Sequence, residues 1–194
     1  MTHPFLESEV EAAALDWFAG LGWTVANGLE IAPGEVAAER MGFEEVTLNT
    51  RLRAAIARLN PAIPGDAQDE AFRKVIRLTA PSLTETNRAF HRMLVDGVEV
   101  EYRRADGSIA GDHVKLIDFA NADENDWLAV NQFTVIEKPH NRRPDIVFFG
   151  NYSGRQRIVM RKAGMQENIF LYSCILYRYF GAVACASHAH ARGY

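Results

Sequence analysis

The chain has few cysteines, no long hydrophobic run and no nucleotide-binding loop. Cys174 and Cys185 are the only cysteines among 194 residues, so no disulfide framework is expected. The longest apolar run is far shorter than a membrane span, and the first residues lack the basic and apolar regions of a signal peptide. We therefore expect a cytoplasmic protein with no membrane partner. The Gly-x-x-x-x-Gly-Lys-Ser/Thr phosphate loop is also missing, so ATP binding is not expected here.

Acidic residues are scarce in only one part of the chain. Residues 151–194 hold six Lys/Arg and a single acid, Glu167, and carry +5, whereas residues 1–150 hold 15 Lys/Arg and 24 Asp/Glu and carry −9. Both cysteines and five of the six tyrosines also lie in residues 151–194. The chain therefore divides near residue 150 into two parts of different composition. The total of −4 excludes a uniformly basic DNA-coating protein, although local basic patches still set the affinity for phosphate.

Hydrophobic residues make up 48% of the chain, which is enough for one domain with a substantial core. Apolar residues at helical spacing dominate the first half, and strand-like apolar runs follow. The patterns predict helices over 8–21, 50–59, 66–78 and 81–96, and strands over 23–26, 98–102, 114–119, 129–137 and 145–149. This order predicts one α+β domain with a helical N-terminal half followed by a mixed β-sheet.

Two Ser-x-x-Glu patterns predict where helices begin. Ser8 and Glu11 form one such capping box, and apolar residues follow them at helical spacing until Gly22 ends the helix. Ser82 and Glu85 form the second. The first pattern gives Glu11 a structural explanation that competes with any functional role.

The stretch 130–149 carries the strongest candidate for chemistry. It is typical of a strand, a polar basic loop and a second strand that opens on Asp145, directly after Pro144. A carboxylate at a strand edge beside Arg142 and Arg143 suits Mg²⁺, which binds one or two carboxylates together with substrate phosphates. Single Asp residues are also common in turns, so an Asp that only pairs with a neighbouring Arg is the alternative.

The polar loop before Asp145 is a candidate phosphate contact. It contains His140, Asn141, Arg142 and Arg143 in sequence. Arginine suits bidentate contact with phosphate, so these residues are candidates for DNA binding. A solvated loop with no ligand explains the same residues equally well.

Five ordered blocks of the sequence resemble the N-terminal domain of the restriction (R) subunit of type I restriction-modification enzymes. The blocks are Glu11–Leu15, Asn87–His91, Val98–Tyr102, Asn131–Glu137 and His140–Phe149. No short motif among them is decisive alone, but the ordered set, which extends over residues 6–150, is specific to the family.

The resemblance implies a nuclease of the restriction-endonuclease-like PD-(D/E)xK type that cuts double-stranded DNA with Mg²⁺. The implied partners are the methyltransferase and specificity subunits of a large ATP-driven complex, with ATP bound by a motor domain that this sequence lacks. Asp145 matches the family's Pro-Asp, which implies a metal ligand. Glu11 matches a glutamate that related nucleases place near the metal on the first helix.

The chain departs from the family after the strand that Asp145 opens. The family's next strand carries Glu-x-Lys, whose Glu completes the metal site and whose Lys positions or activates the attacking water. Family spacing puts Val159 and Arg161 at these positions, and a slip of one residue puts Met160 and Lys162 there. Neither register supplies a carboxylate. We therefore expect Asp145 and Lys162 to be the remaining catalytic residues and the chain to be catalytically impaired.

Two other readings of the chain remain open. One is a catalytically inactive remnant, or a docking module for the methyltransferase and specificity subunits. The other is a different PD-(D/E)xK nuclease, such as a repair or junction enzyme. The helical segment 44–95 favours the R subunit over this second alternative, because it resembles that subunit specifically.

The composition of residues 151–194 suggests a frameshifted or truncated coding region, which we state as a hypothesis. It predicts that the encoding DNA of this segment matches the family better in another reading frame. Translation of that DNA in all frames checks the prediction, and the absence of any better match would contradict it.

Overall fold

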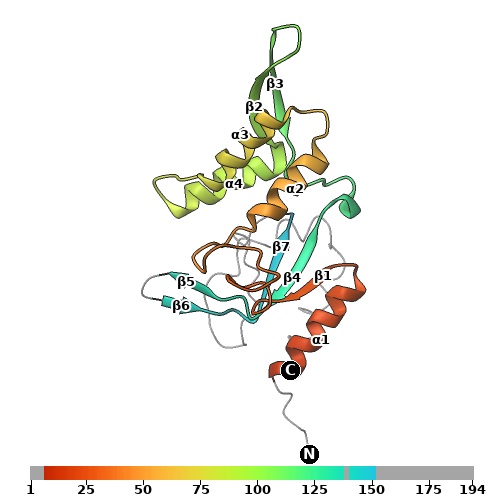
Figure 1. The fold of residues 1–194 in the computed structure, drawn as a ribbon, viewed down its shortest axis with the longest axis vertical. Coiled ribbons are helices and arrows are strands. Elements are labelled where there is room, and N and C mark those ends of the chain that lie inside the picture. The colour runs from red at the N-terminus through yellow and green to blue at the C-terminus, as the bar shows by residue number, and fades with distance from the viewer. Residues whose placement is uncertain (1–6, 138–139, 152–194) are drawn as a thin grey trace, which may run out of the picture.

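The computed structural model describes residues 7–137 and 140–151 of the chain (Figure 1). Its helices are α1 (Glu7–Gly20), α2 (Asn49–Leu59), α3 (Gly65–Ile76) and α4 (Leu83–Asp96), with a short 3-10 helix, η1, at Ala122–Glu124. Its strands are β1 (Thr24–Asn27), β2 (Val98–Arg103), β3 (Ile109–Val114), β4 (Trp127–Asn131), β5 (Val135–Glu137), β6 (His140–Arg142) and β7 (Ile146–Gly150). None of the described helices combines the length and hydrophobicity needed to cross a bilayer.

Strand β4 is the middle strand of a three-stranded sheet. It runs parallel to β1 on one side and antiparallel to β7 on the other, so the sheet is mixed (Figure 1). Leu128 pairs with Thr24 across one edge and with Phe149 across the other. Helices together with a mixed sheet confirm the predicted α+β class. The restriction-endonuclease-like type of the sheet remains a prediction.

Alternating side chains of β4 and β7 form two hydrophobic clusters, one on each face of the sheet, as the two-residue period of a strand requires. One cluster contains Ala129, Ile146 and Phe148, and α1 packs on this face through Phe18, whose ring lies 4.4 Å from that of Phe148. Trp23, just after α1, contacts both rings. The opposite face packs against the long segment between β1 and α2, through the buried residues Ile31, Leu48, Leu128, Val130, Phe133, Val135, Val147 and Phe149.

A second layer contains α2, α3, α4 and the β2–β3 hairpin, and it lies beyond one end of the sheet (Figure 1). Its core combines residues of the three helices with β2, β3 and the segment after β3, including Phe72, Phe90, Val100 and Leu116. The functional candidates Glu11 and Asp145 both lie in the sheet layer. The helical layer therefore supports the site only from a distance.

Asn151, at the end of β7, links the two layers. It is 1% exposed and has a positive φ of 56°, a conformation that Asn tolerates better than most residues. Its amide donates to the carbonyl of Leu116 at 2.9 Å and to Oδ1 of Asn125 at 2.7 Å. Its Oδ1 accepts from the backbone N–H of Asp126 at 2.6 Å. A buried amide with every contact filled fixes the end of β7 against the start of β4.

One of the two predicted capping boxes is confirmed. Ser82 is the N-cap of α4, where its side chain accepts from the backbone N–H of Glu85 at 3.2 Å. The box at Ser8 and Glu11 is wrong, because α1 already includes Glu7 and Ser8 lies inside it. An N-cap residue has a non-helical backbone, so Ser8 does not fill that role. The structural explanation for Glu11 is therefore removed.

The start of α3 differs slightly from the prediction, whereas the end of α1 agrees with it. Helix α3 begins at Gly65 after Pro64, one residue before the predicted start, so the carboxylate of Asp66 lies in the first turn, where the helix dipole favours it. The end of α1 is confirmed, since Gly22 has a φ of 86°. Hydrogen bonds from Gly22 and Trp23 back to the last turn complete this Gly-terminated end.

Two predicted strands are wrong in extent. The strand predicted over 114–119 is instead β3, which begins at Ile109 directly after the turn at 104–108, because the backbone of Arg104 bonds to Ser108 and closes the hairpin there. The strand predicted over 129–137 is broken into β4 and β5 at Gln132, which has a positive φ of 54°. The break at Gln132 matters for function, because it lies beside Asp145.

Candidate metal-binding site

The break after β4 brings Asp145 beside Gln132. The last pair of the β4–β7 ladder is Asn131 with Ile146, so Asp145 and Gln132 lie next to each other just beyond the paired strands. The backbone N–H of Gln132 donates to the carbonyl of Asp145 at 3.2 Å. Asp145 therefore lies at the end of the sheet, half-buried, where its predicted position at a strand edge is confirmed.

Glu11 reaches the same place from α1. Its carboxylate accepts from Nε2 of Gln132, at 3.1 Å to Oε1 and 3.3 Å to Oε2. The packing of Phe18 against Phe148 holds α1 on this face of the sheet. Gln132 therefore bonds to both predicted acidic residues, through its side chain to Glu11 and through its backbone to Asp145.

Glu11 and Asp145 are suitable ligands for a hard divalent cation, but two carboxylates do not complete its coordination. Glu11 and Asp145 offer carboxylate oxygens, which Mg²⁺ prefers, and one or two carboxylates are its usual protein complement. Within residues 7–137 and 140–151, no group of three or more His, Cys, Asp or Glu has the arrangement of a metal site. To hold Mg²⁺, these two carboxylates would need further oxygen ligands from water or a phosphate.

The predicted polar loop is partly a strand. His140, Asn141 and Arg142 form β6, which pairs with β5 in a two-stranded antiparallel ribbon. Asn141, Arg142 and Arg143 are exposed, so their polar groups face solvent and are accessible to a phosphate. Residues 140–142 form a strand because of the break at Gln132, after which β5 turns away from the sheet and pairs with β6.

Four positions that decide the missing half of the predicted site lie outside the described residues. They are Val159, Met160, Arg161 and the predicted catalytic Lys162. Their roles remain predictions from the sequence.

Arg40 stabilises the segment that follows the break, and sequence reasoning missed it. It is 4% exposed, and it donates to the carbonyls of Thr134 at 2.6 Å and Glu45 at 3.1 Å. Its guanidinium lies 3.8 Å from the ring centroid of Phe133. Burial lowers the pKa of Arg40, and the charges of Glu45 and Glu44 oppose that shift. One signal was available: Arg40 is the only Lys or Arg in residues 1–50.

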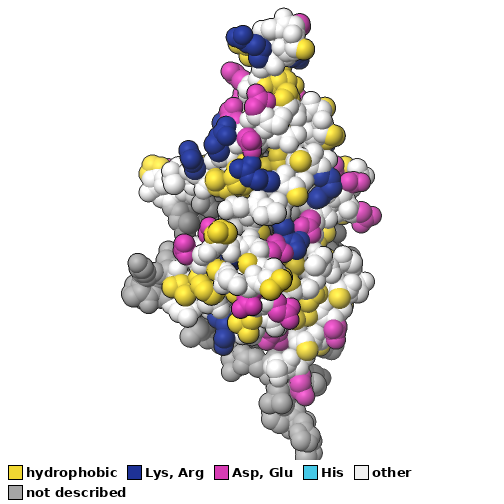
Figure 2. Space-filling view, viewed as in Figure 1, with side chains coloured by type: hydrophobic (Ala, Val, Ile, Leu, Met, Phe, Trp, Pro, Cys, Tyr) yellow, Lys and Arg dark blue, Asp and Glu magenta, His cyan; other side chains and the backbone are white. Residues whose placement is uncertain are grey.

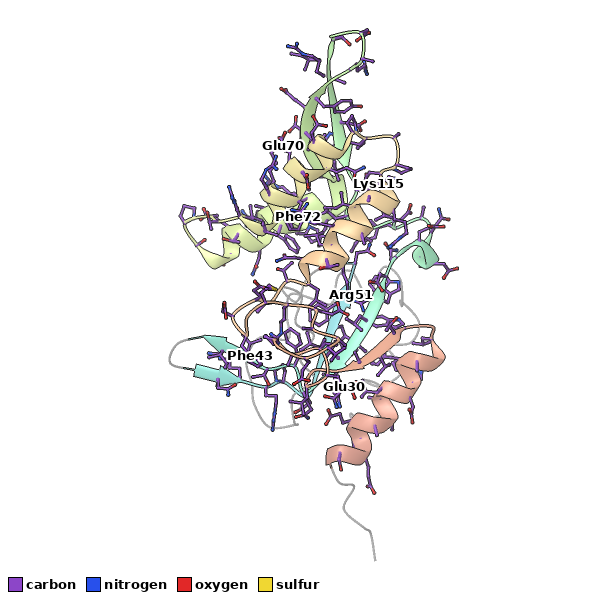
Figure 3. The ribbon with its side chains drawn as sticks, viewed as in Figure 1. Glu30, Phe43, Arg51, Glu70, Phe72 and Lys115 are labelled. Atoms are coloured by element: carbon purple, nitrogen blue, oxygen red, sulfur yellow. The ribbon has the colours of Figure 1, made fainter. Side chains whose placement is uncertain are left out.

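Arg51, on α2, binds the residue next to Arg40. Its guanidinium donates two hydrogen bonds to Glu39, at 2.5 and 2.6 Å, and one to Asp126 at 2.7 Å. Hydrogen bonding to Glu39 raises the pKa of Arg51, burial opposes the shift, and Asp126 adds to it. Figure 3 shows Arg51 at the junction between α2 and the sheet, and Phe43 beside the β5–β6 ribbon. The segment between β1 and α2 is thus held near its middle, at the adjacent residues Glu39 and Arg40.

Charge on the visible face is mixed. Figure 2 shows Lys and Arg gathered over the helical layer and the hairpin, with Asp and Glu among them, while few Lys or Arg lie over the sheet layer. Several of these charges form ion pairs, including Lys74 with Glu70 at 2.7 Å and Arg53 with Asp69. This face therefore offers no uniform basic surface for a nucleic acid.

The fold and the site define a class: an α+β domain with two acidic residues at one end of a mixed sheet. Residues 4–160 match the protein family described as Type I restriction enzyme R protein N terminus. The chain belongs to this family, and the resemblance in the ordered sequence blocks is confirmed.

Two relatives carry names that agree with the family. The chain is 32% identical over 145 residues to the type I restriction enzyme MjaIXP endonuclease subunit assigned in Methanocaldococcus jannaschii. It is 31% identical over 146 residues to the type I restriction enzyme HindI endonuclease subunit of Haemophilus influenzae. These alignments cover 73% and 75% of this chain but 14% of each relative. The chain thus spans a small part of their length.

The role of Arg40 predicts a large difference between two similar substitutions. Arg40→Met leaves two carbonyls without their donor, so we expect a loss of roughly 1–3 kcal/mol in the free energy of unfolding. Arg53→Met is the matched control, because the Arg53 guanidinium also lies 3.8 Å from a ring centroid, that of Phe72, but the Arg53 side chain is 52% exposed. An exposed pair contributes less, about 0–1 kcal/mol. Urea unfolding followed by circular dichroism measures both, and equal losses would contradict the assigned role.

Proposed function

We propose that residues 1–150 form the endonuclease domain of a type I restriction enzyme R subunit, which hydrolyses double-stranded DNA with Mg²⁺. The observation that carries the proposal is the contact of one residue, Gln132, with both Glu11 and Asp145. The family membership and the endonuclease names of the relatives support it. The implied partners are the methyltransferase and specificity subunits, and ATP would act only through a motor domain of the full-length enzyme.

The proposed reaction is hydrolysis of a phosphodiester. The oxygen of water bonds to phosphorus, one ester bond from phosphorus to oxygen breaks, and the leaving oxygen takes up a proton in place of the one that water loses. Mg²⁺ at Asp145 and Glu11 would lower the pKa of bound water and offset charge on the phosphoryl oxygen. Arg142 and Arg143, exposed beside Asp145 in sequence, would contact neighbouring phosphates.

We further propose that this chain is catalytically impaired. A phosphoryl-transfer site with Mg²⁺ needs charge balance around the cation, but the family's Glu position holds Val159 or Met160 here, and its Lys position holds Arg161 or Lys162. Arginine is always protonated and has no lone pair for a metal. Lys162 remains available to position water, so the group that the proposed site lacks is the carboxylate of the family's Glu.

A catalytically inactive domain that docks on the methyltransferase and specificity subunits is the second candidate. The absence of a Glu at positions 159 and 160 favours it, because neither register completes the carboxylate set. The two candidates share the fold and differ in whether Asp145 binds a metal.

Binding of Mn²⁺, a paramagnetic substitute for Mg²⁺, tests the metal site. We expect weak binding by the unaltered chain and an affinity at least about ten times lower after Asp145→Asn, because the substitution removes the charged ligand and keeps its shape. Titration followed by the electron paramagnetic resonance of free Mn²⁺ gives the Kd. Asp112→Asn, an exposed substitution on β3, is the control and should leave the Kd unchanged.

A single substitution then distinguishes impaired nuclease from docking module. Met160→Glu restores the spacing Glu-x-Lys with Lys162, so under the proposal it should yield nicking of supercoiled plasmid in Mn²⁺ or Mg²⁺. That activity should disappear when Asp145→Ala is added. Identical Mn²⁺ affinities for the unaltered chain and Asp145→Asn would contradict the nuclease proposal and favour the docking module.

A further inference from the structure

Gln132 adopts a backbone conformation that its side chain disfavours. Its φ is 54°, and among the described residues only Asn151 shares a positive φ without being glycine. The left-handed region is crowded for any residue with a Cβ, and Asn tolerates it better than Gln. Such a conformation persists only when surrounding contacts hold it, and it is frequent at functional sites. The contacts of Gln132 therefore need an explanation.

The side chain of Gln132 fixes the orientation of the Glu11 carboxylate. Its Nε2 lies 3.1 Å from one carboxylate oxygen and 3.3 Å from the other, so the nitrogen lies close to the line that bisects the carboxylate. Only the NH₂ end of a carboxamide donates to a carboxylate, which determines which way the amide points. Rotation of the Glu11 carboxylate would lose one of the two contacts.

The backbone of Gln132 contacts the backbone of the second acidic residue, Asp145. Its N–H donates to the carbonyl of Asp145 at 3.2 Å, immediately beyond the last paired residues, Asn131 and Ile146. One residue thus bonds to two positions that are far apart in sequence and come from different elements, α1 and the start of β7. Gln132 makes both contacts while its backbone is in the left-handed conformation.

We propose that Gln132 is a positioning residue of the metal site, which holds the Glu11 carboxylate at the place where Glu11 and Asp145 can bind one divalent cation together. The inference rests on the proposed function, because it assumes that Asp145 is a ligand. Hydrogen-bond partners that orient a ligating side chain typically change metal affinity about 10–100-fold.

Two substitutions separate the effect of the Gln132 side-chain amide from the effect of its strained backbone. Gln132→Met keeps the length of the side chain and the strain but removes the N–H donors, and Gln132→Gly removes both the side chain and the strain. We expect the Kd for Mn²⁺ to rise by about tenfold or more in both variants. The urea midpoint of the Gly variant should equal or exceed that of the unaltered chain, so that its loss of affinity is not a loss of folding.

The same variants in a Glu11→Gln background complete the test. If Gln132 acts through Glu11, then Glu11→Gln alone weakens Mn²⁺ binding, and a further change at Gln132 adds nothing. An unchanged or higher affinity in both Gln132 variants, with Asp145→Asn and Glu11→Gln still weakening it, overturns the positioning role and leaves the proposed function intact. No effect of Asp145→Asn overturns the proposed function itself.

Discussion

The break in the backbone at Gln132 connects the two predicted acidic residues, Glu11 and Asp145, through one residue. Continuing as a strand beyond Asn131 would keep Gln132 in the ladder with β7 and send its side chain to one face of the sheet. The N–H of Gln132 still bonds to the carbonyl of Asp145, but with a φ of 54° the chain leaves the ladder after this residue, and the side chain of Gln132 reaches Glu11. The β5–β6 ribbon exists for the same reason, because β5 is no longer part of β4.

The rest of the sheet layer stabilises this arrangement from both sides. On one face, Phe18 packs against Phe148 and holds α1, and with it Glu11, over the sheet. On the other face, the buried guanidinium of Arg40 bonds to Thr134, two residues beyond the break. Hydrogen bonds offset the cost of burying a charge, and two nitrogens of Arg40 bond to carbonyls, whereas its Nε has no acceptor among the described residues. The break is therefore held by contacts distant in sequence.

Much of the fold followed from local patterns, and the site followed only in part. The second capping box, the extent of α2 and the strand at 98–103 are local features, and the sequence predicted them well. The same Ser-x-x-Glu pattern misled at Ser8, since the pattern does not reveal which residue starts the helix. Asp145 was predicted from its position before an apolar strand and from the family resemblance. Gln132 and Arg40 were not, because their roles depend on partners 121 and 94 positions away.

The central claim is that Glu11 and Asp145, joined through Gln132, can hold one divalent cation. Anomalous X-ray diffraction from crystals soaked in Mn²⁺ tests it most directly, because the peak locates the ion independently of any activity. The account predicts one peak at the end of the sheet beyond Asn131, in contact with carboxylate oxygens of both residues. No peak at saturating Mn²⁺, or a peak that contacts neither carboxylate, would contradict it.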